Sequence, residues 1–409
     1  MNILFLSPAV PYPPNQGGAI RTWGLLRGLA RSHRVSLMAF SQEVVAERAV
    51  VIEPVLQAVC ERVLLVEMPM RIKSTRLKDL LFSRQADLAL RLYSPKFASS
   101  LQTWLCHTLF DFVIIEGLEM ACYLPVVRQH SQAKIVFDAF NAETLIQQRA
   151  FETDIRQPKR WGAAFYSLLQ AGRIQRFERA VCQQSDLVLA VSSEDQTLLA
   201  EHTPQRAVYR IPNGIRLADL AKHAPPYPFS HPTLLFTGKM DYRPNADAVE
   251  WFAHEIFPLV RAQVPDAEFW IVGKQPIASV RVLANEPGVV VTGEVPDTHP
   301  YLAGCAVYVA PLRMGGGTRL KLIEALAQRK AIVATTIGAE GFAFQNDVEL
   351  LLAEDAPDFA NAVLNLLAHP PTRTRLAEAG YQRIAAEFDW EVIVPQLEQI
   401  LQEMMCSSL

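Results

Sequence analysis

A glycine-rich turn is the part of this sequence whose residue types are best suited to bind a ligand. Gly315, Gly316 and Gly317 follow an apolar segment, 306–310, and precede an apolar helical period that begins at Leu320. This order predicts a buried strand, a close turn and a helix N-terminus. Unpaired backbone N–H groups and the helix dipole at such a turn favour an anion that approaches the backbone closely.

Side chains with opposite charge follow the glycines. Thr318 comes first, Lys321 adds a cation, and Glu324 falls one helical turn further, on the same side as Leu320. An anion site beside a carboxylate suits a ligand that carries both phosphate and hydroxyl groups. A nucleotide sugar is such a ligand.

A second glycine with cations follows another predicted strand, 234–236. Gly238 allows close approach, and Lys239 and Arg243 are two cations that can hold a diphosphate. Pro244 suits the first turn of the next helix. A solvated pair of surface charges remains the alternative interpretation.

Two further turns follow predicted strands. In 291–297, the backbone near Val295 is a place for a base to rest, and a plain strand-end turn explains the segment equally well. After the first strand, Gly17 and Gly18 end a loop before a helix that we expect to start near Ala19, which suits an anion or a sugar; a flexible loop tip is the alternative. This loop is neither GxGxxG nor a P-loop, which disfavours a dehydrogenase or a P-loop NTPase.

Composition narrows the class of protein. The 409 residues are half hydrophobic and one-fifth charged, with a net charge of −3, which predicts a folded protein of two domains that does not bind nucleic acid. The cysteines are scattered, no histidines have metal-ligand spacing and no Asp-x-Asp pair occurs. We therefore expect no metal, no cofactor and a cytoplasmic setting. No apolar run is long enough to span a membrane, and prolines interrupt the apolar N-terminus.

Short apolar runs alternate with helical patterns along the whole chain, which predicts parallel strands buried on both faces and doubly wound α/β sheets. The predicted strands are 3–6, 35–39, 63–66, 112–115, 135–137, 187–191, 234–236, 269–272, 289–291, 306–310, 331–334 and 350–352. A proline-rich stretch, 221–232, separates the halves. We predict domains at 1–214 and 215–389, with a helix at 390–409 that packs back on the first domain.

The order of these segments resembles the GT-B glycosyltransferases of the retaining group 1, or family four. The Gly238–Asn245 segment is similar to that of a subgroup associated with exopolysaccharide and protein-sorting systems. The resemblance implies two Rossmann-like domains facing a central cleft, a nucleotide-diphosphate sugar as co-substrate and a glycan, lipid-linked or small-molecule acceptor held mainly by the first domain. It also implies that Glu324 holds the donor ribose, while Lys239, Lys321 and the Gly317–Thr318 amides surround the diphosphate.

The sequence departs from this family at two positions. Gly316 stands where a glutamate often contacts the transferred sugar, and Phe140 stands where many relatives have a histidine. Asp138 and Asn141 are our candidate catalytic residues, and Glu143 is a further polar candidate that equally suits a helix start. The rival functions are a GT-B nucleotide-sugar epimerase and a non-catalytic nucleotide-sugar binding protein.

Two basic stretches, 71–78 and 156–179, offer a peripheral contact with the inner face of the membrane. A solvated charged face explains them as well.

Overall fold

The computed structural model describes residues 1–14, 17–41, 46–71, 79, 83, 85–155, 161–220 and 225–406. Most of the predicted basic stretch 71–78 lies outside these ranges, as do Lys159, Arg160 and positions 221–224 of the predicted linker. The chain divides into two compact units: unit 1 comprises 1–213 with 393–409, and unit 2 comprises 214–392. Each is described by itself.

Unit 1 contains a parallel sheet with the order β3-β2-β1-β4-β5-β6-β7 within the described residues. Its strands are β1 (Asn2–Ser7), β2 (Arg34–Ser41), β3 (Arg62–Glu67), β4 (Phe112–Glu116), β5 (Lys134–Asp138), β6 (Leu187–Ala190) and β7 (Val208–Arg210). The strand order reverses between β1 and β4, which makes that point the topological switch where such sheets bind ligands.

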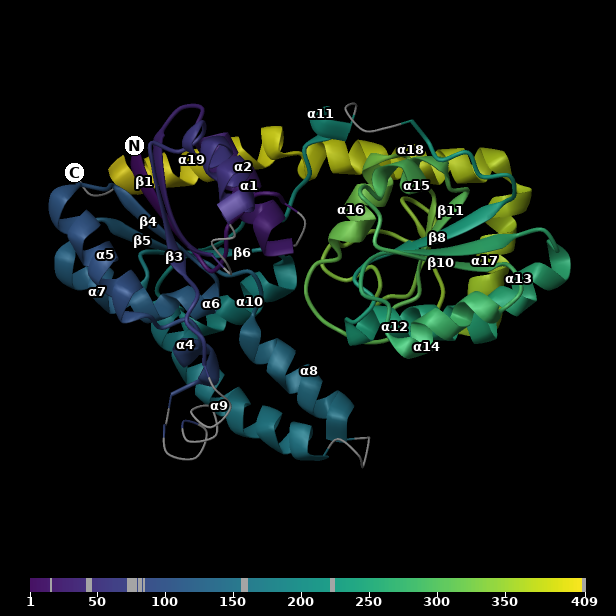
Figure 1. Ribbon diagram of the computed structural model, residues 1–409, viewed down its shortest axis with the longest axis horizontal. Coiled ribbons are helices and arrows are strands. Elements are labelled where there is room, and N and C mark those ends of the chain that lie inside the picture. Colours follow the sequence, from purple (N-terminus) through teal and green to yellow (C-terminus); the bar gives the residue numbers. More distant parts are fainter. Residues whose placement is uncertain are drawn as a thin grey trace. The chain divides into compact units, whose positions relative to one another are not determined.

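Helices connect these strands and cover the sheet (Figure 1). They are α1 (Gly17–Leu29), α2 (Ala46–Gln57), α4 (Asp87–Arg91), α5 (Pro95–His107), α6 (Gly117–Met120), α7 (Leu124–His130), α8 (Glu143–Ile155), α9 (Trp161–Gln184) and α10 (Ser193–His202), with a 3-10 turn at Ala121–Tyr123. Helices α8 and α9 lie side by side as a long hairpin.

Unit 2 contains a second parallel sheet with the order β10-β9-β8-β11-β12-β13. Its strands are β8 (Thr233–Thr237), β9 (Glu268–Val272), β10 (Val289–Gly293), β11 (Val307–Ala310), β12 (Ile332–Ala334) and β13 (Leu351–Leu352). Here the order reverses between β8 and β11, so the loops after these two strands meet at the switch point.

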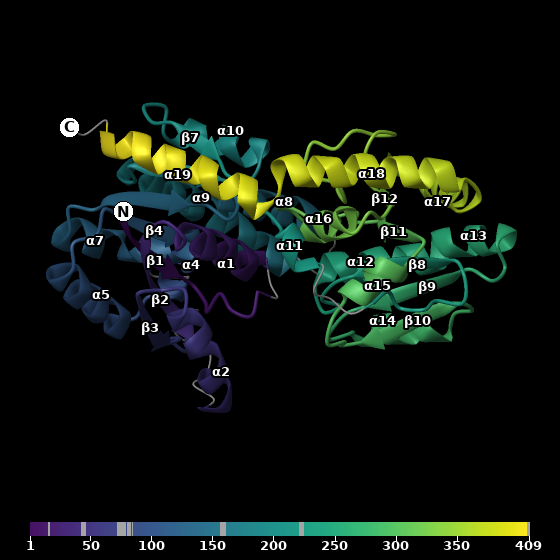
Figure 2. The same cartoon turned by 90° about the horizontal axis from the view of Figure 1, so that it is seen from above.

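The helices of unit 2 lie on both faces of its sheet, with α16 and α18 side by side (Figure 2). They are α11 (Leu217–Leu220), α12 (Arg243–Trp251), α13 (Phe257–Gln263), α14 (Ala278–Val282), α15 (His299–Gly304), α16 (Leu320–Ala327), α17 (Ala356–Ala368) and α18 (Pro370–Glu387), with a π-helical turn at Phe252–Ile256 and a 3-10 turn at Leu283–Asn285.

Alternating side chains fill the two faces of each sheet. In β8, Leu234 and Phe236 pack into one apolar cluster, whereas Leu235 packs into the cluster on the opposite face, and all three are fully buried. This burial on both faces explains why the strands read as continuous apolar runs rather than as alternating patterns.

The last helix, α19 (Trp390–Cys406), lies along unit 1 for most of its length (Figure 2). Leu397 and Leu401 are fully buried there. A Cβ at Gly28 of α1 would lie only 2.3 Å from Cγ2 of Val394, so this glycine permits the close approach of α1 and α19.

Local signals fix several helix starts. Pro95 stands in the first turn of α5, and the Ser94 hydroxyl accepts a hydrogen bond from Phe97 N at 3.4 Å. At α17, the Asp355 carboxylate accepts a bond from Asp358 N at 2.8 Å. Both side chains satisfy N–H groups that have no partner within the helix.

Candidate functional site

The glycine loops of unit 2 meet at the switch point of its sheet. Gly238 follows β8, and Gly315–Gly317 follow β11, the strand that pairs with β8. The predicted order of strand, glycine turn and helix is thus confirmed at both loops. Because the carboxyl ends of parallel strands share one edge of the sheet, both loops lie where ligands of such sheets bind.

The glycine-rich loop before α16 has backbone conformations that require glycine. Gly315 has φ +105 and Gly317 has φ +80, a region that side chains disfavour. The buried Arg319 supports the loop, since its Nη1 donates to the Gly316 carbonyl at 2.8 Å. Within the described part of the chain, no side chain caps the N-terminus of α16, so its N–H groups are available to an anion.

Asn245 ties the two loops together. Its Nδ2 donates to the Lys239 carbonyl at 2.9 Å, and its Oδ1 accepts a bond from Lys321 Nζ at 2.8 Å. A Cβ at Gly238 would lie 2.7 Å from Asn245 Nδ2 and 3.2 Å from Lys321 Nζ. Glycine at 238 therefore keeps room for this contact.

Lys321 is surrounded by protein atoms but keeps partial contact with solvent. Its Nζ lies 4.1 Å from the centroid of the Phe236 ring. Burial lowers the pKa of Lys321 to about 7; the neighbouring Arg319 charge lowers it further, while Glu324 opposes the shift. An anion placed here would restore the full charge of the ammonium group.

Glu324 shares this environment. Burial raises its pKa to about 7, Lys321 opposes that change, and the Asp297 carboxylate adds to it. Its side chain is partly exposed and has no hydrogen-bond partner in the described part of the chain. A cation with uncapped helix N–H groups, beside an unpaired carboxyl group, can bind a phosphate and a hydroxyl group together.

The other predicted residues of unit 2 surround this centre. Lys239 is half exposed, with its Nζ 3.1 Å from an Asp241 carboxylate oxygen. Arg243 begins α12, and Thr318 packs against Gly341, where a Cβ would lie 2.8 Å from Thr318 Cγ2. The partly buried Val295 follows β10 and packs on the apolar cluster beneath α16.

In unit 1, the predicted glycine loop also lies at a switch point. Gly17 and Gly18 begin α1, directly after the loop that follows β1. The ring of Phe140, which follows β5, covers two glycines: Cβ atoms at Gly18 and at Gly117 would lie 3.2 and 3.3 Å from it. Packing of this ring accounts for glycine at both positions.

Asp138, one of the two residues predicted to be catalytic, lies inside unit 1. It is fully buried, and Arg21 donates to both carboxylate oxygens at distances of 2.6–3.1 Å. Arg21 Nη1 also donates to the Ile211 carbonyl at 2.8 Å. These contacts hold the end of β5 against α1, and a catalytic role of Asp138 stays a prediction.

A second buried carboxyl group lies beside this ion pair. Thr22 Oγ1 donates to Glu116 Oε2 at 2.8 Å, and Oε1 has no partner within the described ranges. Burial, with the nearby Asp138 charge, raises the pKa of Glu116 to about 8. Glu116 therefore stays protonated at neutral pH.

Asn141, the other predicted catalytic residue, is partly exposed at the start of the segment that leads into α8. It forms a hydrogen bond with the Glu143 carboxyl group. Burial and the charge of Glu178 raise the pKa of Glu143 to about 7. The segment thus presents a polar amide and a carboxyl group that exchanges its proton near neutral pH.

The sequence predicts no role for Asn245 or Arg319, although Asn245 is the last residue of the Gly238–Asn245 segment that follows β8. Each has a partner that is distant in sequence, Lys321 for Asn245 and the Ile337 carbonyl for Arg319, and no local pattern marks either residue. The described ranges contain no group of three or more His, Cys, Asp or Glu side chains placed to hold a metal ion. Among the described helices, none is both long enough and apolar enough to cross a bilayer.

Comparison with known proteins shows what the chain is similar to. Residues 231–369 match the family model of glycosyl transferases group 1. The chain is 21% identical, over 95% of its length and 96% of the relative's, to an uncharacterized 44.6 kDa protein in the cps region of Klebsiella pneumoniae. It is 30% identical to the phosphatidyl-myo-inositol mannosyltransferase of Mycolicibacterium smegmatis, a match over 46% of this chain that spans only half of that relative.

Solved structures share the fold over the whole chain. Sucrose-phosphate synthase from Thermosynechococcus elongatus superimposes with a TM-score of 0.71 at 18% identity, covering all of both chains. HepE of Anabaena in complex with UDP has a TM-score of 0.66 at 13% identity, covering 98% of this chain and 100% of that one. The predicted GT-B fold is confirmed by these structures, and the similarity to glycosyl transferases group 1 covers residues 231–369.

Proposed function

We propose that this protein transfers a sugar from a nucleotide-diphosphate donor, held by unit 2, to a glycan, lipid-linked or small-molecule acceptor, held by unit 1. The observation that carries the proposal is the cluster of Lys321, Glu324 and two glycine loops at the switch point of the second sheet. Within one helical turn it combines an anion site with a carboxyl group that can accept hydrogen bonds from hydroxyl groups.

Each part of the donor has a matching group. The Lys321 ammonium group and the amides around Gly317–Thr318 bind the diphosphate, and the half-exposed Lys239 adds a second cation. Glu324 accepts hydrogen bonds from the ribose hydroxyl groups. The base rests against the backbone near Val295. The UDP bound in HepE, which has the same fold, is consistent with this class of ligand.

The chemistry follows from the charges. As the bond between the anomeric carbon and the diphosphate breaks, negative charge grows on the leaving oxygen, and the cations and amides of the loop stabilise it without reorganising. The acceptor oxygen forms its bond to the same face of the sugar, with retention, and its proton passes to the departing diphosphate. Asn141 contacts the transferred sugar, and Gly17 and Gly18 let it approach the backbone of unit 1.

The Gly238–Asn245 segment supports membership of the subgroup associated with exopolysaccharide and protein-sorting systems. The match to a protein in the cps region of Klebsiella pneumoniae is consistent with polysaccharide biosynthesis. The acceptor would then be a growing glycan in the cytoplasm or at the inner face of the membrane.

A stripe on α9 supports the peripheral membrane contact. Trp161, Phe165 and Leu168 are 62%, 68% and 55% exposed, and their spacing places them on one helical face. The exposed Arg176 and Arg179 continue that face. An apolar stripe followed by arginines suits insertion beside anionic headgroups.

Vesicle sedimentation tests the membrane contact. Vesicles containing phosphatidylglycerol should bind the protein more than pure phosphatidylcholine vesicles, and salt should weaken the binding. The double variant Trp161→Ser/Phe165→Ser should lose it. Leu109→Ser, at an apolar residue 92% exposed elsewhere on unit 1, should not. Equal loss in both variants would remove α9 as the membrane surface.

Donor turnover tests the proposed transferase. Nucleoside diphosphate sugars carrying a labelled sugar are incubated with the protein and a panel of acceptors, and transfer, hydrolysis and epimer formation are measured. Glu324→Ala and Lys321→Ala should each weaken donor binding in calorimetry, whereas Lys96→Ala, at an exposed lysine of α5, should not. Donor binding without any turnover would support a non-catalytic binding protein, and an epimer as product would support the epimerase.

A further inference from the structure

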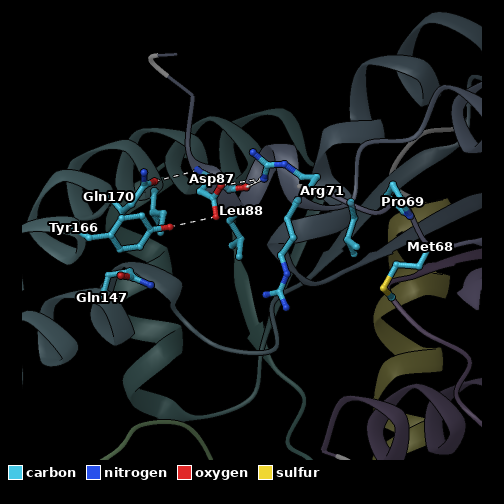
Figure 3. A pocket seen from close by; sticks show the side chains of 11 residues that line it. Met68, Pro69, Arg71, Asp87, Leu88, Gln147, Tyr166 and Gln170 are labelled. Atoms are coloured by element: carbon cyan, nitrogen blue, oxygen red, sulfur yellow. Dashed lines mark hydrogen bonds and ion pairs between the residues drawn. The ribbon is translucent and has the colours of Figure 1, made fainter. Parts of the chain in front are cut away.

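Unit 1 contains a pocket to which the glycine loops do not contribute. Its volume is about 430 Å³, within the range of roughly 300–1,000 Å³ that is typical of small-ligand sites. Met68, directly after β3, lies on one side of it, and α4, α8 and α9 form the other walls (Figure 3). It therefore lies beyond the carboxyl end of a strand, on the edge of the sheet where ligands bind.

Hydrogen bonds around Asp87 hold one wall in place (Figure 3). Arg71 Nη1 donates to Asp87 Oδ1 at 2.9 Å, and the Tyr166 hydroxyl donates to Oδ2 at 3.2 Å. The Asp87 N–H donates to Gln170 Oε1 at 3.0 Å. These bonds fix the polar side chains before a ligand arrives, which reduces the entropy that binding costs.

Several polar groups on this wall still lack partners. The amide of Gln147 makes no hydrogen bond within the described part of the chain. Gln170 is 1% exposed, and its buried Nε2 has no partner there either. An amide both donates and accepts. A ligand with hydroxyl groups would satisfy these amides better than one that only accepts or only donates.

Charge on the described residues of the pocket disfavours an anion. The two guanidinium groups among these lining residues are already paired: Arg71 with Asp79 and Asp87, at 2.6 and 2.9 Å, and Arg91 with Glu119 at 2.8 Å. Within the described part of the chain, three carboxylates thus pair with these two guanidinium groups. A phosphate would have to displace one of these carboxylates, whereas a neutral ligand leaves the pairs intact.

The remaining wall is apolar, with Leu88, Leu92 and Ile174, and the Tyr166 ring lies at its border. A pyranose ring has C–H groups on its faces and hydroxyl groups around its rim. We propose that this pocket binds a neutral saccharide unit of the acceptor, with its rim hydrogen-bonded to Gln147 and Gln170 and one face against the apolar wall. The proposal rests on the proposed transferase function and narrows the acceptor to a carbohydrate.

Methyl glycosides test the pocket without knowledge of the natural acceptor. The full-length protein is titrated with the methyl glycosides of glucose, galactose, mannose and N-acetylglucosamine, and with inorganic phosphate, using saturation-transfer NMR. At least one glycoside should bind. Gln147→Leu should weaken that binding about five- to tenfold, the loss expected for one neutral hydrogen bond with its partner left unpaired.

Gln148→Leu is the matched control, because Gln148 is the adjacent, exposed glutamine of α8 and does not line the pocket. It should leave glycoside binding unchanged, and both variants should keep the thermal stability of the wild type. If no glycoside binds, if Gln147→Leu leaves binding unchanged, or if phosphate displaces the glycoside, the saccharide pocket is wrong.

Donor binding is measured on the same samples and separates this proposal from the proposed function. If the protein binds and hydrolyses a nucleotide sugar but Gln147→Leu leaves glycoside binding unchanged, the saccharide pocket is wrong and the transferase function stands. Glycoside binding that Gln147→Leu weakens, with no nucleotide sugar bound by unit 2, would overturn the transferase and leave a saccharide site.

Discussion

The pKa of Lys321 predicts how donor affinity changes with pH. In the free protein burial holds this pKa near 7, so the protonated fraction falls from about nine-tenths at pH 6 to about one-tenth at pH 8. If only the ammonium form binds the diphosphate, affinity should fall roughly tenfold over this range. Nucleotide sugars suit the measurement because their diphosphate is esterified at both ends and lacks the ionisation near pH 6 of a terminal phosphate.

Glu324 acts in the opposite direction, because its carboxyl group, with a pKa of about 7, accepts ribose hydroxyl groups best when ionised. The wild type should therefore bind most tightly near pH 7. In Glu324→Gln, donor affinity should no longer increase between pH 6 and 7 but should still decrease toward pH 8. In Lys321→Arg, whose guanidinium group stays charged throughout, donor affinity should still increase with pH but should no longer decrease toward pH 8.

Isothermal titration calorimetry of the wild type, these two variants and Lys321→Met across this pH range checks the prediction. Lys321→Met should cost about 1.5–3 kcal/mol, the range for hydrogen bonds to charged groups, or roughly 10- to 150-fold in affinity. Thermal melts verify that the variants remain folded. Wild-type affinity in Lys321→Met at pH 6, together with a pH profile that Lys321→Arg leaves unaltered, would refute the reasoning.

Three further predictions concern the buried charges and one glycine. Asp138→Asn should lower the melting temperature by about 10 °C because it leaves its buried arginine partner uncompensated; an unchanged melting temperature would argue against a structural role. Glu116 has a pKa of about 8 in the folded protein, above its unfolded value, so its stabilising contribution is lost as pH rises toward 8. The melting temperature of Glu116→Gln relative to the wild type should therefore increase from pH 5 to pH 8. A difference in melting temperature that stays constant over this range would contradict this. Gly273→Ala would place a Cβ 1.7 Å from the Gly238 carbonyl oxygen and should reduce both stability and donor affinity, whereas Gly162→Ala, with nothing within 4 Å, should reduce neither.

The strands could be predicted from the sequence because burial on both faces makes each one an apolar run. Each predicted strand coincides with an observed one to within a residue or two at its ends. The edge strand β7, Val208–Arg210, was missed. It has three residues, of which only Val208 is buried, so it lacks the apolar run that marks the others.

The glycine loops of unit 2 could also be predicted from the sequence, because glycines between a strand and a helix are a local signal. The side chains that organise those loops were not found, because their contacts are long-range. Asn245 meets Lys321 across 76 positions, and Arg21 meets Asp138 across 117. Without the position of Arg21, an aspartate at a strand end is indistinguishable from an exposed catalytic carboxylate, which is why the ion pair of Asp138 could not be predicted.

The buried charges of unit 1 also explain how its part of the site is held. Arg21 joins α1 to the end of β5 through Asp138 and reaches the Ile211 carbonyl just after β7. Such an ion pair contributes little net stability, because desolvation offsets most of its attraction, but it enforces one arrangement of the elements it joins. Here that arrangement keeps the N-terminus of α1 and the segment after β5 in register, with the Phe140 ring against Gly18. A phenylalanine ring has no hydrogen-bonding group. The polar contacts that we propose between this part of unit 1 and the transferred sugar therefore fall to backbone groups and Asn141, and a precisely fixed backbone is what such contacts need.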